Sequence, residues 1–173
     1  MVMLNKLQRI LKHRWMEDAS RLLAPAALHR LRSKIATSEA LHSGEIRICV
    51  ESGLPNGYLL RSDSMRALLR QRALAHFGRL GVWDTEANNG VLIYLCLAER
   101  AIELVADRGI HRLVPQETWD KLVQHLAVQL KQDQIEIGLL HSVEEVTALL
   151  AKHFAVAPGE RNPNELPDSV VLR

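Results

Sequence analysis

A continuous apolar stretch, Val91 to Leu97, constrains the fold more than any other part of the chain. Such a run, bounded by turn-forming residues, is typical of a β-strand that is covered on both faces. A second strand-like segment, Ala101 to Ala106, begins after only a short turn. Because the link is so short, we expect the two segments to pair as antiparallel strands.

Hydrophobic periodicity predicts the remaining elements. Residues 45–51 alternate polar and apolar side chains and predict a first strand, with Ile46, Ile48 and Val50 on one face. Apolar residues at helical spacing predict helices at residues 4–15, 25–42, 62–80, 115–130 and 135–154. A strand–helix–strand unit with short links closes as a parallel, right-handed pair. The predicted fold class is therefore α/β, a three-layer α/β/α sandwich around a small mixed sheet.

Length and charge suggest how the chain is divided. With 173 residues the chain can form one domain with its own core. We expect a basic amphipathic helix at residues 1–24, a domain at 25–155, and an extended tail at 156–173. Residues 1–36 carry a net charge of +6 and the remainder −4. A basic segment of this kind can dock on the acidic body, on an anionic membrane surface or on nucleic acid.

Two of these options can be weighed further. Aromatic residues make up only 4% of the chain, which leaves few stacking platforms and argues against nucleic acid. No stretch approaches the roughly 20 apolar residues of a membrane helix, and the N-terminus lacks the apolar region of a signal peptide. The expected location is the cytoplasm, with residues 4–15 able to contact the inner membrane face.

Cys49 and Cys96 lie in apolar strand patterns and are expected to be reduced core thiols.

Several short motifs together resemble the TPM domain family, whose name joins a thylakoid-lumen protein, a photosystem II repair factor and an animal receptor modulator. The resemblance covers roughly residues 25–155. The matching residues are Gly44 to Arg47, Phe77, Gly81 to Trp83, Asn88 to Leu95, Arg100 to Val105 and Gly109. The resemblance implies an α/β/α sandwich, divalent-cation binding at strand-end loops, and roles in assembling or repairing membrane protein complexes. It also implies acid phosphatase activity, which is claimed for a plant relative.

Strand geometry predicts which polar residues can meet. The start of the first strand, the start of the second and the end of the third lie at one edge of the sheet. This edge gathers only oxygen-bearing side chains, and these suit a hard cation such as Ca²⁺ or Mg²⁺. The candidate metal ligands are Glu45, Asp84, Glu86, Asn88, Asn89 and Asp107. The segment is not an EF-hand, because Leu95 stands where the bidentate glutamate belongs.

A simpler interpretation of the same loop stays open. Asp84 and Thr85 can cap a turn, and Asn89 and Gly90 tolerate a positive φ. The opposite edge of the sheet receives Glu51, Ser52, Glu99 and Arg100. Parallel strands usually present ligands at this carboxyl edge, but the tight link there leads us to expect a solvated turn at Glu99 and Arg100. The arginines between Arg61 and Arg79 are likewise expected on a solvated helix face.

Two functions follow from these observations. The first is a non-catalytic TPM-type binding module that assists the assembly or maintenance of a protein partner at a membrane surface, with weak Ca²⁺ or Mg²⁺ binding. The alternative is a metal-dependent acid phosphatase centred on Asp84, Glu86 and Asp107. The chain has no phosphate-binding glycine loop, no dinucleotide motif and no hydrolase or metalloprotease motif, so no catalytic residue is assigned.

Overall fold

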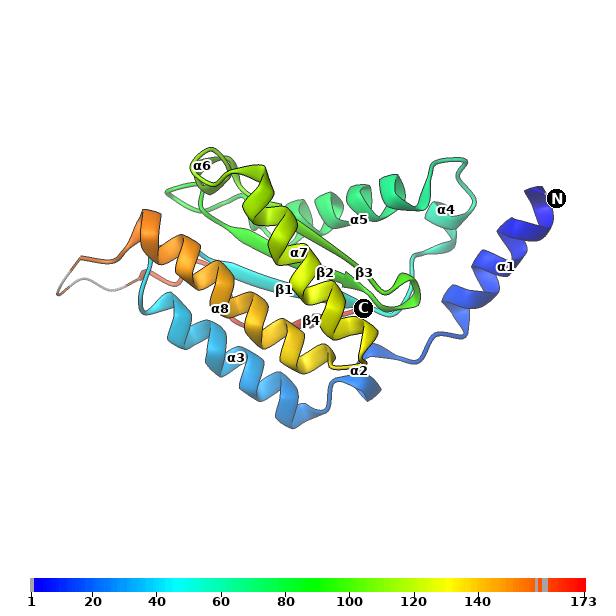
Figure 1. Cartoon of the computed structure of the whole chain (residues 1–173), viewed down its shortest axis with the longest axis horizontal. Coiled ribbons are helices and arrows are strands. Elements are labelled where there is room, and N and C mark those ends of the chain that lie inside the picture. The colour runs from blue at the N-terminus through cyan, green and yellow to red at the C-terminus, as the bar shows by residue number, and fades with distance from the viewer. Residues whose placement is uncertain (1, 158, 160–161) are drawn as a thin grey trace.

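Helices cover both faces of a small mixed sheet in the computed structural model (Figure 1). The structure describes residues 2–157, 159 and 162–173, and the side chains of residues 2–7 are outside that description. The helices are α1 (Val2–Arg14), α2 (Ala19–Leu22), α3 (Pro25–Glu39), α4 (Asn56–Leu59), α5 (Met65–Arg79), α6 (Arg108–His111), α7 (Gln116–Lys131) and α8 (Ile135–Phe154). The strands are β1 (Ile46–Glu51), β2 (Val91–Cys96), β3 (Ala101–Ala106) and β4 (Val171–Leu172), and a 3₁₀ turn (Leu97–Glu99) joins β2 to β3.

The sheet has the order β3-β2-β1-β4. Strand β1 is parallel to β2, with Ile46 opposite Val91, and β3 is antiparallel to β2, with Ala106 opposite Val91. The prediction of a parallel pair followed by an antiparallel hairpin is therefore confirmed. The tail supplies a fourth strand that was not predicted, because β4 pairs in parallel with β1 at Cys49 and Val50.

Two hydrophobic clusters show why the sheet is sandwiched. Ile46, Ile48 and Val50 of β1 face α3, α7 and α8, where Leu31, Leu126 and Val146 are among the buried residues. The opposite face packs against α5 and α4 through residues that include Leu68, Leu92, Tyr94 and Val105. Both faces of β1 and β2 are buried along their whole length, so the three-layer α/β/α architecture is confirmed.

Local signals set the ends of the long helices. Ser64 caps α5, since its Oγ accepts the Ala67 N–H at 3.3 Å. Helix α5 ends at Arg79, and Gly81 follows its C-cap with a φ of +69°, a left-handed conformation that glycine adopts without strain. Pro115 immediately precedes α7, as its sequence position predicts. The short helices α2, α4 and α6 were not predicted, because four residues are too few to establish a period.

Candidate functional site

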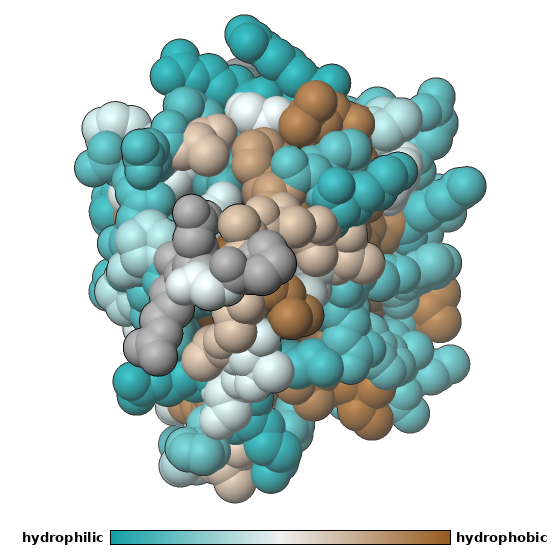
Figure 2. All heavy atoms as spheres, turned by 90° about the vertical axis from the view of Figure 1, so that its left-hand side faces the viewer, coloured by the Kyte–Doolittle hydropathy of each residue, from teal (hydrophilic) through white to brown (hydrophobic). Residues whose placement is uncertain are grey.

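The amino edge of the sheet assembles as the strand geometry predicts. The Val91 N–H donates to the Glu45 carbonyl at 2.8 Å, and the Asp107 N–H donates to the Gly90 carbonyl at 2.9 Å. The starts of β1 and β2 and the end of β3 therefore meet at one place. Figure 2 shows this end of the molecule as a largely hydrophilic surface with a few separate hydrophobic patches.

The loop before β2 is fixed by two glycines that allow backbones to touch. A Cβ on Gly90 would lie 2.0 Å from the Val82 carbonyl oxygen, and one on Gly109 would lie 2.5 Å from the Asn88 oxygen. The left-handed residue is Asn88, with φ +52°. The expectation that Asn89 and Gly90 supply positive φ was wrong, because Gly90 is needed for space and not for its dihedral freedom.

Glu45 is buried at this edge and holds the C-terminal tail. Its carboxylate oxygens accept the backbone N–H groups of Glu165 at 3.0 Å and Leu166 at 3.2 Å. Burial raises the pKa of Glu45, while these two hydrogen bonds oppose the increase. Its oxygens therefore bind the chain itself in the observed arrangement. The tail has no helical or strand periodicity over residues 162–168, so the sequence held no signal for this contact.

The other predicted ligands fall into two groups. Asp84 and Glu86 are exposed, and the Glu86 backbone N–H donates to the Glu165 carboxylate at 3.2 Å. Asn88 Oδ1 accepts Arg108 Nε at 2.8 Å, and Asp107 Oδ1 caps α6 through the Arg108 N–H at 2.7 Å. These side chains stabilise the loop and the helix start.

Two oxygens of the predicted ligands are buried at this edge without a donor. They are Asn89 Oδ1 and Asp107 Oδ2. Asn89 is otherwise well held, since its N–H donates to Thr85 Oγ1 at 3.0 Å and its Nδ2 donates to Ser43 Oγ at 3.2 Å. Within the part of the chain that the structure describes, no group of three or more His, Cys, Asp or Glu side chains could hold a metal ion. The six predicted ligands therefore share an edge but do not form one coordination site, and metal binding stays a prediction.

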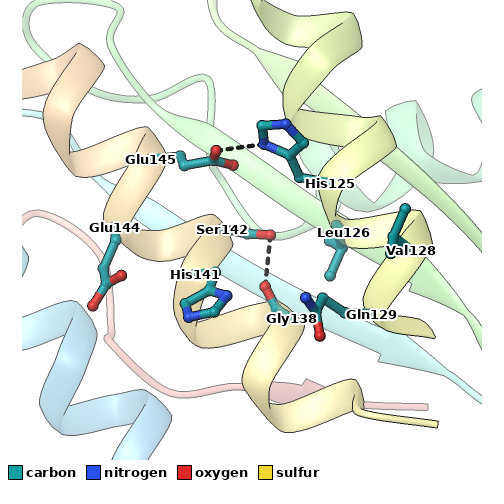
Figure 3. Close-up of a pocket in the computed structure, with 9 residues that line it drawn as sticks. All are labelled: His125, Leu126, Val128, Gln129, Gly138, His141, Ser142, Glu144 and Glu145. Carbon is teal, nitrogen blue, oxygen red and sulfur yellow. Dashed lines mark hydrogen bonds and ion pairs between the residues drawn. The ribbon is translucent and has the colours of Figure 1, made fainter. Parts of the chain in front are cut away.

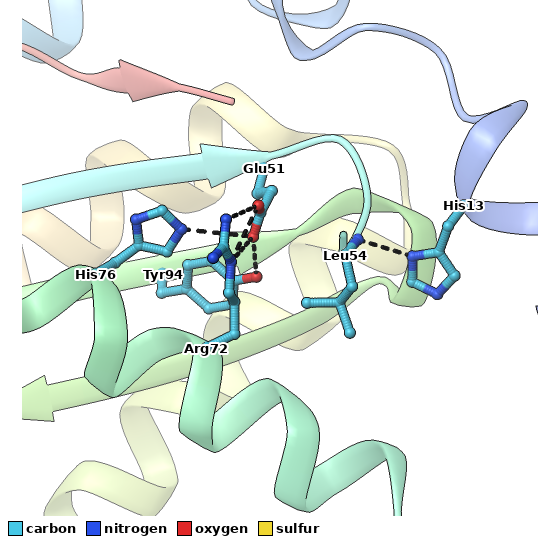
Figure 4. Close-up of polar contacts among 6 residues, drawn as sticks. All are labelled: His13, Glu51, Leu54, Arg72, His76 and Tyr94. Atoms are coloured by element: carbon cyan, nitrogen blue, oxygen red, sulfur yellow. Dashed lines mark hydrogen bonds and ion pairs between the residues drawn. The ribbon is translucent and has the colours of Figure 1, made fainter. Parts of the chain in front are cut away.

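A buried polar cluster lies at the opposite edge, where β1 ends (Figure 4). The Glu51 carboxylate accepts Arg72 Nε at 3.0 Å and Arg72 Nη2 at 2.5 Å, and it accepts the Tyr94 hydroxyl at 2.7 Å. His76 Nε2 lies 3.5 Å from the same carboxylate. Burial alone would raise the pKa of Glu51, but the contacts with His76, Arg72 and Tyr94 lower it to about 2. Glu51 is therefore an ionised, fully paired group inside the sandwich.

Sequence reasoning missed this cluster, although a signal was present. Arg72 and His76 follow Leu68 and Leu69 at helical spacing and lie on the buried side of α5. The expectation of a solvated arginine face between Arg61 and Arg79 does not hold for Arg72, which is buried. The position of Arg72 in the apolar stripe of α5 is better evidence for burial than its charge is for exposure.

Helix α1 docks at this carboxyl edge through His13. His13 Nδ1 accepts the Leu54 N–H at 2.9 Å, and Nε2 lies 2.9 Å from Glu99 Oε1, which also accepts Lys12 Nζ at 2.9 Å. A Cβ on Gly53 would lie only 2.7 Å from the His13 carbonyl oxygen, so the two backbones are in close contact. Glu99 is therefore an anchor for α1, which corrects the expectation of a solvated turn.

Two of the hollows formed by the described residues lie away from these edges. One, of about 370 Å³, is between α7 and α8, where His125 Nδ1 and Glu145 Oε1 are 2.7 Å apart and Ser142 Oγ donates to the Gly138 carbonyl (Figure 3). Its rim groups already bind one another. The other, of about 850 Å³, is a groove along β3 between α5 and α7.

A membrane-spanning helix needs a long, almost uncharged apolar stretch, and no helix in the described part of the chain has one.

Comparisons with known proteins agree with this architecture. A family model described as the TPM domain matches residues 16–149. Among solved structures, the NMR structure of the BA42 protein from the psychrophilic bacterium Bizionia argentinensis is similar. The two chains are 27% identical, the match covers 86% of this chain and 94% of that one, and the TM-score is 0.71. No curated protein matches the chain.

Proposed function

Because the chain belongs to the TPM domain family, we propose that it is a non-catalytic binding module that helps to assemble or maintain a protein partner at the cytoplasmic face of a membrane. One observation carries this proposal. Leu11 is 44% exposed and Trp15 is 85% exposed, and both lie beside the basic residues Lys12 and Arg14 at the end of α1. Exposed apolar and aromatic side chains flanked by cations are what an interfacial helix places at an anionic membrane.

The anchoring of α1 supports the same role. His13 and Lys12 fix the helix to Leu54 and Glu99. Leu11 and Trp15 therefore project from a held segment, so fewer conformations have to be lost when they meet a surface. The family match begins at residue 16, so α1 adds this feature to the matched domain.

Vesicle flotation tests the proposal. We expect the full chain to float with phosphatidylcholine vesicles that contain phosphatidylglycerol, and a double variant Leu11→Gln, Trp15→Ser to bind about tenfold less. Trp83→Ser is the matched control, because Trp83 is also exposed but lies at the other end of the molecule. Equal flotation of the double variant and the wild type would remove the membrane part of the proposal.

Weak binding of Ca²⁺ or Mg²⁺ at the amino edge is the second part of the proposal. The observation that favours it is the pair of buried oxygens without donors, Asn89 Oδ1 and Asp107 Oδ2. A ¹⁵N NMR titration with each ion should shift the amides of residues 84–90. If those amides do not move while the ions reach millimolar excess, the cation role is wrong. The alternative function, a metal-dependent acid phosphatase centred on Asp84, Glu86 and Asp107, shares only Asp107 with this pair. An unchanged phosphatase rate in Asp84→Ala would end it.

A further inference from the structure

Strand β3 is an edge of the sheet and presents open backbone groups. Because the Asp107 N–H donates to the Gly90 carbonyl, residues 101, 103 and 105 direct their backbone groups towards β2. In an antiparallel ladder the intervening residues point the other way. Ile102, Leu104 and Ala106 therefore direct their N–H and C=O groups away from the sheet.

The open side of β3 is the floor of a groove. Helices α5 and α7 flank the strand (Figure 1), and the hollow between them measures about 850 Å³. Its α5 wall includes Leu74 and Phe77, and its α7 wall includes Trp119 and Val123. Both walls combine these apolar residues with polar ones. Such walls can contact the side chains of an added strand, which point alternately to the two faces.

One side chain shows that the edge accepts donors from outside the sheet. Arg70 Nη1 donates to the Leu104 carbonyl at 2.7 Å, where the N–H of a neighbouring strand would otherwise donate. Arg66 lies one turn earlier on α5, lines the same groove and is exposed. Glu103 lies in the same groove, where burial raises its pKa and the charges of Arg70 and Arg66 oppose that increase. The α5 wall therefore places two exposed cations, Arg66 and Arg70, beside the open strand.

We propose that this groove binds an extended peptide of the partner protein, which adds to β3 as a further strand and sets an acidic side chain against Arg66 and Arg70. The inference rests on the proposed binding function and names its partner class. The added strand replaces Arg70 at the Leu104 carbonyl. The backbone pairing then provides affinity, and Arg66 and the released Arg70 select the acidic side chain.

A second copy of the chain fits the groove less well than a peptide. Two β3 edges that meet about a two-fold axis would place α5 beside α5 on the same face of the joined sheet. The exposed Arg66 and Arg70 of both copies would then lie near each other, and their like charges would repel. A single strand with an acidic side chain meets the same cations favourably.

Selection from phage-displayed random nonapeptides on the full-length chain tests the inference. We expect the enriched peptides to alternate apolar residues and to carry an acidic residue. In ¹⁵N NMR the tightest peptide should shift the amides of residues 102, 104 and 106. Arg66→Glu should weaken its binding about tenfold, whereas Arg32→Glu on α3 should leave it unchanged. Ala106→Pro should weaken it as well, since it removes an outward N–H without touching the ladder to β2.

Three outcomes would overturn the inference. The first is no enrichment, and the second is enriched peptides that bind Arg66→Glu as tightly as the wild type. The third is a chain that is a dimer in analytical ultracentrifugation and becomes a monomer in Ala106→Pro. Vesicle flotation does not use the groove. If flotation persists while peptide binding fails, the groove inference is wrong and the proposed function stands.

Discussion

Two carboxyl groups lie buried at opposite ends of strand β1, and the protein favours the neutral form of one and the ionised form of the other. Glu39 is 4% exposed and its Oε1 accepts the N–H of Ile46, the first residue of β1. Glu51, the last residue of β1, is 3% exposed. Burial, with smaller contributions from Glu45 and Asp168, raises the pKa of Glu39 to about 9, whereas the contacts of Glu51 lower its pKa to about 2.

Hydrogen-bond geometry explains the difference better than the nearness of an arginine. Arg72 reaches Glu51 with two nitrogens, and Tyr94 adds a third donor. Glu39 also has an arginine nearby, but Nε and Nη1 of Arg47 are buried without a partner, and so is Glu39 Oε2. A nearby charge that makes no directed bond does not offset desolvation. The two sites therefore carry different expectations for stability.

Removing an arginine should separate the two sites most strongly. Arg72→Met leaves the Glu51 charge buried and unpaired, and we expect it to lower the free energy of unfolding at pH 7 by about 3–5 kcal/mol. Arg47→Met removes a guanidinium whose Nε and Nη1 have no partner, and we expect a change within about 1 kcal/mol. Urea denaturation of both variants checks this. Equal losses would show that the two arginines play the same part.

Removing one donor should have a smaller effect. Tyr94→Phe keeps the ring but deletes the hydroxyl that donates to Glu51 at 2.7 Å, and we expect a loss of about 1.5–3 kcal/mol, as for a hydrogen bond to a charged group. The same substitution in a Glu51→Gln background should cost clearly less. If the cost is the same in both backgrounds, the hydroxyl does not act through Glu51.

The pH dependence of stability should carry opposite signs at the two sites. Glu39 has a folded pKa of about 9 against 4.5 in the unfolded chain, so its contribution is complete below pH 4.5 and is lost as pH rises towards 9. Glu51 has a folded pKa of about 2, so its contribution is complete above pH 4.5 and is lost as pH falls towards 2. Melting temperatures measured across this range should show Glu39→Gln flattening only the alkaline limb and Glu51→Gln only the acid limb. A flattened acid limb in Glu39→Gln would contradict the assignment.

The sequence predicted the sheet well because its evidence is local. The apolar run from Val91 and the alternation over residues 45–51 identified three strands and their directions. The same rules placed Glu45 and Asp107 correctly at one edge. Strand β4 could not be predicted, because two residues at the end of a polar tail, Val171 and Leu172, have no period.

The candidate sites were predicted less well because they depend on contacts between distant segments. The hydrogen bonds from Glu165 and Leu166 to Glu45 join segments about 120 residues apart in the sequence. Helical and strand periodicity predicts only local contacts and gives no sign of them. His13 is buried, and no spacing in the sequence indicates its burial. The burial of Arg72 could have been predicted, because Arg72 follows Leu68 and Leu69 at helical spacing on α5.

The smallest effect should come from the tail. The negative charge of Asp168 adds to the high pKa of Glu39, after burial and the charge of Glu45. Asp168→Asn should therefore lower the pKa of Glu39 and raise the free energy of unfolding by roughly 0.5 kcal/mol or less near pH 8, where Glu39 begins to ionise.

Asp120→Asn on α7 is the control for a general loss of negative charge. The gain should shrink in a Glu39→Gln background, because the neutral amide no longer responds to the charge at residue 168. A gain of the same size in both backgrounds would show that the tail acts on the fold without acting through Glu39.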